Sequence, residues 1–452
     1  MTAPLVFFNP QAAPAVLLTQ QLRAIQKRAL LDQAAGQFEQ LTLLLAHAHR
    51  YSPFWRDRLA AVNYGSATID AHFLKSLPIL TRQDLQENFD ALQAKWPDLK
   101  EEDIFSVTSS GSTGKPVRVQ KFRKFQNPLD SAHTLIELEW HNIDPHQTIA
   151  YLGFGIDDQA HLSWGGIFQA LHYKGRCLTR NVTQHSLESH LDWLMKEKPA
   201  YLKVSPFVAA QLARLALDQK KSLPIKAIIC QSEKVSAVHR ALCKEAFGAT
   251  IIDRYSSEET GLIALQCPSH HDLHVMSAGV IVEIVNASGQ ACAIGEVGKV
   301  LVTNLVSYAM PIIRYDLGDF ASWGPACNCG MTLPVISKLW GRVRNSVIHA
   351  DGSAHPMGFL GDDIGMMPNI LEFKIEQYLG KELYLELVCK QALNQEEINQ
   401  IHEIFAKNGL SGLWLFIMRV SKLTDDGQPK REEFKQVGQN GTFPQEAIKI
   451  RI

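Results

Sequence analysis

The chain has 452 residues, of which 46% are hydrophobic and 20% are charged, a composition typical of a soluble globular protein. Its length exceeds that of a usual single core and predicts two domains. The 45 lysines and arginines balance 46 acidic residues, so charge gives no case for binding nucleic acid or an anionic membrane. No apolar run approaches the ~18 residues of a membrane span. The amino terminus lacks the basic start of a signal peptide, and eight cysteines in this length form no disulfide framework, which favours the cytoplasm.

The first informative segment is the loop at residues 109–116, SSGSTGKP, between apolar stretches at 104–107 and 117–119 that predict strands. Small and hydroxylated residues with one cation, Lys115, can bring N–H groups, hydroxyls and an ammonium close to a phosphate chain. A Walker P-loop is excluded, because Pro116 stands where that motif has its Mg²⁺-binding Ser or Thr. A plain surface hairpin remains the alternative for the loop taken alone.

The middle of the chain alternates helix and strand patterns. Helices are predicted from Ser186 to Pro199, over 207–217 and from Ser236 to Gly248, and strands over 201–204, 225–230 and 250–253. Units this compact imply right-handed crossovers and a mostly parallel sheet. Ligands usually bind at the carboxyl ends of such strands, where 231–233 follow one strand and 255–261 follow the next.

The segment after Arg342 has a different pattern. Strands are predicted over 373–376, 383–387 and 413–420, with an amphipathic helix over 395–407 capped by Asn394. The expected fold class is therefore α/β. It comprises a large N-terminal domain, residues 1–341, with mostly parallel sheets flanked by helices, and a small α+β C-terminal domain, residues 342–452.

The ordered set of motifs resembles the adenylate-forming (acyl-AMP) superfamily, and within it the phenylacetate–CoA ligase branch. The resemblance rests on the loop at 109–116, DRYSSEETG at 253–261, RYDLGD at 314–319 and Gly341-Arg342, with support from the flanking segments 52–56, 77–85 and 310–315. It covers roughly residues 40 to 345 well. It implies ATP-dependent and Mg²⁺-dependent activation of a carboxylic acid to an acyl adenylate, transfer to CoA as a thioester, and a small domain that acts as a mobile lid.

The resemblance also implies roles for individual residues. Glu259 would hold Mg²⁺, Tyr255 would stack on adenine, Asp319 would accept the ribose hydroxyls, and Arg342 would contact ribose or phosphate. In isolation these residues are equally well explained as a solvated glutamate, a core-edge tyrosine and a turn aspartate. The remaining nucleotide-binding positions are Ser110, Gly111, Ser112, Thr113, Gly114 and Lys115 for the phosphates, together with Ser232 and Glu233.

Three positions depart from the family pattern. Glu258 stands where the family has a small hydroxyl residue before the metal-binding glutamate. The segment from Pro429 to Lys435 keeps the family's spacing of six positions from proline to the catalytic lysine but lacks the small residues and the glycine before that lysine. Lys435 is therefore assigned as the catalytic lysine, with Lys430 as the next choice and a solvated charged turn as the alternative. The hinge at Gly341-Arg342 lacks the Asp-Asp pair that follows it in the family. The adenylation step is therefore more firmly expected than the identity of the acyl acceptor. A carrier-protein phosphopantetheine or an amine could replace CoA as the acceptor. A nucleotide-binding scaffold without catalysis is a further alternative.

A structural zinc site of the kind found in parts of this branch is also expected. Cys327 and Cys329 form a C-x-C-G turn whose glycine lets two thiolates converge on one ion. Cys267 supplies a third ligand, and His274 is favoured as the fourth over His270 and His271. The alternative is a set of unrelated buried thiols and surface histidines.

The acid itself is weakly specified. Residues 151–156 and 163–168 are rich in glycine and aromatic residues, which suits a flat apolar ring, so the resemblance favours an aromatic or arylalkanoic acid. Ordinary packing of helices on the sheet explains the same composition. The oligomeric state stays open, with a homodimer as one option.

Overall fold

The computed structural model describes residues 10–97, 99–109, 116–231, 233–342, 346–348, 354–356, 360–365, 367–378, 382–407, 410–423, 434–437, 444 and 446–452. The chain divides into two compact units. The first contains residues 1–233, 243–317 and 321–338, and the second contains 234–242, 318–320 and 339–452. The chain passes from the first unit to the second for the last time between Lys338 and Leu339. No helix in the described part of the chain is long and apolar enough to cross a membrane.

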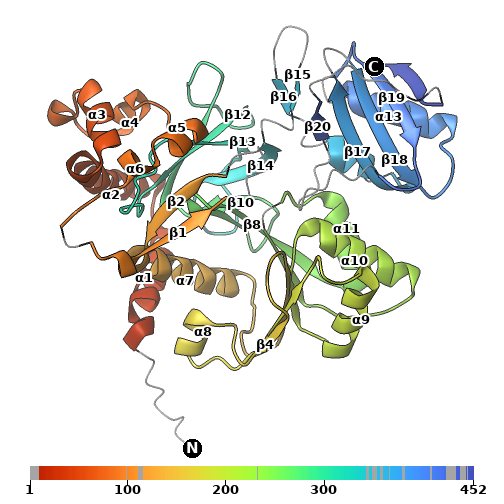
Figure 1. Cartoon of the computed structure of the whole chain (residues 1–452), viewed down its shortest axis with the longest axis horizontal. Helices are drawn as coiled ribbons and strands as arrows, with labels where there is room; N and C mark the ends of the chain where they lie inside the picture. The colour runs from red at the N-terminus through yellow and green to blue at the C-terminus, as the bar shows by residue number, and fades with distance from the viewer. Residues whose placement is uncertain are drawn as a thin grey trace, which may run out of the picture. The chain divides into compact units, whose positions relative to one another are not determined.

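The helices of the first unit and its border are α1 (Ala13–Ile25), α2 (Leu30–Tyr51), α3 (Pro53–Ala61), α4 (Ala71–Ser76), α5 (Arg82–Glu87), α6 (Phe89–Leu92), α7 (Arg123–Trp140), α8 (Gly166–Ala170), α9 (Leu187–Glu197), α10 (Pro206–Asp218) and α11 (Ala237–Phe247). Figure 1 shows α2 to α6 gathered as one helical group at the upper left of the view. Their apolar side chains, including the fully buried Trp55, form one core with Tyr315.

The strands that precede residue 343 are β1 (Ile104–Thr108), β2 (Arg118–Phe122), β3 (Ile149–Gly153), β4 (Gln159–His161), β5 (Cys177–Asn181), β6 (Tyr201–Lys203), β7 (Ala227–Gln231), β8 (Thr250–Ser257), β9 (Gly261–Gln266), β10 (Leu273–Val275), β11 (Val280–Val285), β12 (Val297–Asn304), β13 (Tyr315–Trp323) and β14 (Val335–Arg342). Among the described residues, twelve of them form one sheet in the order β11-β12-β13-β14-β10-β9-β8-β7-β6-β3-β5-β4.

The sheet contains both parallel and antiparallel strands. Its parallel strands come from the middle of the chain, where alternating helix and strand patterns predicted a parallel sheet. Strands β5, β3, β6, β7 and β8 run parallel, whereas β8 to β10 and β14 are antiparallel to their neighbours. Serine caps start the helices between the parallel strands, as at Ser186 before α9 and Ser205 before α10. The helix and strand order predicted for this segment is confirmed.

One face of the parallel strands packs against α7. Leu135 and Leu138 of α7 share a core with Tyr201, Ile229 and Ile252 of the strands. Because side chains alternate along a strand, residues such as Leu202 and Ile228 point to the opposite face. The crossover helices α9 and α10 belong to that opposite face, because right-handed crossovers place them together (Figure 1).

The second unit contains β15 (Ser346–Ile348), β16 (Ala354–Pro356), α12 (Leu360–Gly365), β17 (Ile370–Tyr378), β18 (Glu382–Cys389), α13 (Gln395–Lys407), β19 (Trp414–Arg419), β20 (Phe434–Gln436) and β21 (Ile448–Arg451). Five of these strands form a sheet in the order β20-β17-β18-β19-β21. Phe405 and Ile401 of α13 pack on Leu385 and Leu415 in its core. The predicted β-β-α-β order is confirmed within the described residues.

Candidate active site

The base of the phosphate loop is a closed hairpin. Strands β1 and β2 pair antiparallel from Ile104 opposite Phe122 to Thr108 opposite Arg118. Beyond them, Ser109 N donates to Val117 O at 2.8 Å, and Val117 N donates to Ser109 Oγ at 2.9 Å. The predicted turn between two strands is therefore present, and its tip, Ser110 to Lys115, lies outside the described residues.

Glu259 lies in the turn between β8 and β9 and is 8% exposed. Its Oε1 accepts a hydrogen bond from the Tyr315 hydroxyl at 3.3 Å and lies 3.5 Å from Arg82 Nη1. The other guanidinium nitrogen of Arg82, Nη2, donates to Ser109 Oγ at 3.2 Å. One guanidinium therefore joins the start of the phosphate loop to the carboxylate predicted to hold Mg²⁺. Burial and the Glu259 charge raise the pKa of Tyr315, so its phenol stays protonated as a donor.

Local sequence explains why Arg82 reaches this position. Thr81 caps α5 by a capping box with Asp84, so the helix begins at Arg82. Asp84 is in turn held by Arg58 at 2.9 Å. Sequence reasoning quoted this segment for its resemblance but assigned Arg82 no role. A lone arginine at a helix start carries no signal of its own, because its partners lie more than 25 residues away in the chain.

Two nucleotide-site predictions need correction in their local structure. Tyr255 was expected just beyond the end of a strand, but β8 continues to Ser257, and Tyr255 is 6% exposed within it, opposite Ala264. Asp319 was expected after a sharp turn, but it lies inside β13. Gly318 before it has φ of 74°, a backbone conformation that glycine adopts without strain. Strand pairing, which a local pattern does not reveal, extends both strands past these motifs.

Arg314 of the RYDLGD motif has a structural role. Its guanidinium makes a bidentate pair with Glu283, with Nε at 2.9 Å and Nη2 at 3.1 Å, and Nη1 donates to the carbonyls of Lys75 and Leu77. The residue is 4% exposed and has φ of 51°. It ties the N-terminal helical group to β11, and so holds Tyr315 next to Glu259.

The remaining predicted residues are placed less completely. Glu233 follows β7 and is partly buried, and Ser232 lies outside the described residues. Arg342 is the last residue of β14. Lys435 lies in β20, where it is in register with Glu376 of β17, and Lys430 lies outside the described residues. The side-chain positions of Arg342 and Lys435 are outside the described part of the structure.

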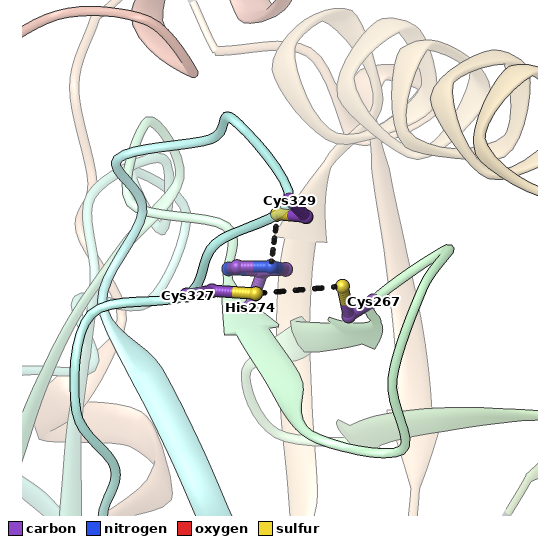
Figure 2. A group of neighbouring side chains, drawn as sticks. All are labelled: Cys267, His274, Cys327 and Cys329. Atoms are coloured by element: carbon purple, nitrogen blue, oxygen red, sulfur yellow. Dashed lines mark hydrogen bonds between the residues drawn. The ribbon is translucent and has the colours of Figure 1, made fainter.

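The four predicted zinc ligands come together in one cluster, shown in Figure 2. Cys267 follows β9, His274 lies in β10, and Cys327 and Cys329 lie in the loop between β13 and β14. Their ligand atoms all lie within 4.8 Å of one another. Strand β10 pairs with both β9 and β14, which brings together loops sixty residues apart in the chain.

The donor set fits a zinc ion. Cys267 Sγ and Cys327 Sγ are 3.7 Å apart, and Cys329 Sγ lies 3.3 Å from His274 Nε2. Two thiolates bound to one tetrahedral zinc with bonds of ~2.3 Å would lie roughly 3.8 Å apart. His270, a weaker candidate, contacts Asn328 Oδ1 at 2.6 Å. All eight cysteines are free thiols, in agreement with the absence of a disulfide framework.

Comparison with known proteins gives the same picture. No protein-family model matches the chain. It is 25% identical to the phenylacetate-coenzyme A ligase of Escherichia coli strain K12 over 344 residues, which are 73% of this chain and 75% of that protein. It is 25% identical to the phenylacetate-coenzyme A ligase of Pseudomonas putida over 386 residues, which are 81% of this chain and 77% of that protein.

A solved structure with the same fold is 2-hydroxyisobutyryl-CoA ligase in the postadenylation state, in complex with R3-HIB-AMP. It matches with a TM-score of 0.73 and 17% identity, and the match covers 92% of this chain and 91% of that one. At this identity the match shows the fold. The motifs, the fold and the curated relatives agree, and the chain is similar to the phenylacetate–CoA ligase branch of the adenylate-forming superfamily.

Proposed function

We propose that the protein activates an aromatic or arylalkanoic carboxylic acid with ATP and transfers the acyl group to CoA. The observation that carries the proposal is the contact of Arg82 with both Ser109 and Glu259, because it brings a phosphate-type loop and a metal-type carboxylate to one place. The names of the curated relatives, phenylacetate-coenzyme A ligases, support the acid class and the acceptor.

In the first step a carboxylate oxygen attacks the α-phosphorus of ATP, and the bond to pyrophosphate breaks. The loop from Ser110 to Lys115 would hold the β- and γ-phosphates, and Arg82 at its base would add a second cation. Glu259 would hold the Mg²⁺ ion, which supplies charge neutralisation at the phosphates. Tyr315, protonated beside Glu259, would keep that carboxylate oriented.

In the second step the CoA sulfur attacks the acyl carbonyl carbon, the bond to AMP breaks, and the thiol proton leaves to solvent. Lys435 would serve the first step only, because the resemblance implies a lid that changes position between the steps. The C-terminal unit has its own apolar core, as a moving lid requires.

The support for an aromatic acid comes from one of the two glycine-rich segments. Trp164 and Phe168 of the second segment pack against each other and against Tyr201, and Trp164 Nε1 donates to Gln147 O. Their role is therefore helix-to-sheet packing. In the first segment Tyr151 is partly exposed and Phe154 is 39% exposed, so these two rings could contact an acyl group.

We also propose that Cys267, His274, Cys327 and Cys329 bind one structural zinc ion. Four protein ligands leave no open position for a substrate or water, which is typical of structural rather than catalytic zinc. The ion would join the β9–β10 turn to the β13–β14 loop.

The proposed activity is tested by exchange of labelled pyrophosphate into ATP in the presence of a panel of carboxylic acids. Acid-dependent and Mg²⁺-dependent exchange is expected, followed by thioester formation when CoA is added. Exchange without any CoA thioester would move the acceptor to a carrier protein or an amine. Absence of exchange with every acid would contradict the proposal.

A further inference from the structure

Helix α7 carries a row of polar side chains toward the sheet. Gln126, Asp130, His133 and Glu137 are spaced by four, three and four residues, which places them on one helix face. Gln126, His133 and Glu137 are buried. A buried polar row against a sheet is unusual for a surface helix and requires partners on the strands.

The strands supply two cations for one carboxylate. Arg254 of β8 has its Nε 3.1 Å from Oε1 of Glu137, whose side chain is 2% exposed. Lys203, the last residue of β6, interacts electrostatically with both Glu137 and Arg254. His133 adds no charge, because burial lowers its pKa to about 3. The buried carboxylate is therefore shared between two cations.

The ammonium of Lys203 shares the Glu137 carboxylate with Arg254 and has no carboxylate of its own in an ion pair among the described residues. It lies 4.8 Å from the centroid of the Tyr151 ring, and it makes no ion pair with a described carboxylate. The neighbouring Cys177 thiol does not compensate it, because burial raises the pKa of that thiol and keeps it neutral. Burial, with a further contribution from Arg254, lowers the pKa of Lys203 to about 8, so the group is still mainly charged at neutral pH.

The position of Lys203 in the fold is that of a ligand contact. It ends β6, and its β-strand neighbour on β3 is Tyr151, in register. Both side chains are partly exposed, although they lie under α7 between strands. The carboxyl ends of parallel strands form the crevice where ligands of α/β proteins bind. An apolar acyl group in that crevice would leave a desolvated ammonium against hydrocarbon, which is costly.

We propose that the acid activated by this enzyme carries a second carboxylate, and that Lys203, backed by Arg254, binds it at the end of the acyl group remote from the reacting carboxyl. The inference rests on the proposed function and narrows its substrate class to dicarboxylic acids. Tyr151 packs beside the ammonium and provides the face for the body of the acyl group.

The test uses acids that differ in the remote substituent alone. Phenylacetate, its 3- and 4-carboxy derivatives and the matching neutral carboxamides are compared by kcat/KM in pyrophosphate exchange. For the wild-type enzyme a carboxy derivative is expected to exceed its carboxamide by about 10- to 100-fold, the scale of one charge-assisted hydrogen bond. In Lys203→Met this preference should vanish, mainly through a higher KM for the carboxy acid. Lys203→Arg should keep the preference.

The matched control is Lys226→Met, the same substitution at an exposed lysine next to β7, which should leave the preference unchanged. Thermal unfolding of each variant identifies loss of fold, and Lys203→Gln replaces Lys203→Met if that variant does not fold. Equal rates with carboxy and carboxamide acids in the wild type would overturn the inference but leave the proposed function intact. An equal loss with every acid in the Lys203 variants would also overturn it. If none of the acids supports pyrophosphate exchange, the proposed function itself is refuted.

Discussion

Glu259 is the residue on which the proposed adenylation most directly depends. Its carboxylate is 8% exposed and lies between the Arg82 guanidinium and the Tyr315 hydroxyl. Glu259→Gln keeps the shape and both contacts but removes the charge that would bind Mg²⁺. Pyrophosphate exchange should fall by ~10²-fold or more, since one preorganised charge at a phosphoryl centre has effects on this scale.

The neighbouring glutamate provides the control for this prediction. Glu258 is exposed, in contrast to the buried Glu259. Glu258→Gln should change exchange by much less than Glu259→Gln, and a titration with Mg²⁺ should show a higher requirement in the Glu259 variant alone. A larger loss of exchange in the Glu258 variant than in the Glu259 variant would identify Glu258 as the Mg²⁺ ligand instead.

The pH dependence of selectivity follows from Lys203. Its pKa of about 8 lies below the ordinary lysine value because of burial and Arg254, so the ammonium is present below pH 8 and is lost as the pH rises. The ratio of kcat/KM for carboxy and carboxamide acids should therefore be highest below pH 7 and decline through pH 8. The other groups that face Lys203 are Glu137, Cys177, Tyr151 and Arg254.

The Lys203→Arg variant distinguishes titration of Lys203 from titration of these neighbouring groups, because a guanidinium stays charged across this pH range. Its selectivity ratio should remain flat from pH 6 to 9. A decline with the same midpoint in Lys203→Arg would assign the titration to another group.

At the scale of elements, strand β10 with its two neighbouring loops forms the candidate zinc site. The cluster of Cys267, His274, Cys327 and Cys329 joins the turn between β9 and β10 to the loop between β13 and β14. Purified protein should contain about one zinc per chain, and Cys327→Ser should lose it. The midpoint of thermal unfolding should fall by a few degrees, because a loss of ~1 kcal/mol corresponds to roughly 2–4 °C in domains of about 150–250 residues.

Cys292 is the matched control for the zinc prediction, since it is a buried thiol outside the cluster. Cys292→Ser should retain the zinc content of the wild type. Folded and active protein that contains no metal would rule out the zinc site.

At the scale of the whole molecule, the lid hypothesis concerns Lys435. The residue lies in β20 of the second unit, in register with Glu376. Lys435→Ala should lower the adenylation rate by ~10²-fold while ATP affinity stays nearly constant, because the contact matters in the transition state. Thioester formation from a synthetic acyl adenylate should persist.

Lys430→Ala is the companion variant. If it damages adenylation and Lys435→Ala does not, the catalytic role passes to Lys430. Equal loss of both half-reactions in Lys435→Ala would contradict a lid with two positions.

Patterns along the chain were sufficient for the order of elements from α9 to β8 and from β17 to β19. Hydrophobic periodicity and serine caps are local properties, which is why α9, α10 and the strands between them were predicted close to their observed bounds. The zinc candidates were also within reach of the sequence, because cysteine and histidine are few and their spacing is restrictive.

Tertiary structure alone decided the environment of the site. Arg82 meets Ser109 and Glu259 through contacts that cross 27 residues and more than 170. The environment of Lys203 depends on Glu137 of α7 and Arg254 of β8, because burial and shared charge arise only when the sheet and the helix have packed together. The ends of β8 and β13 were likewise set by pairing with neighbouring strands rather than by their own residues. A sequence pattern reports which side chains share a face, but long-range packing determines which charges meet.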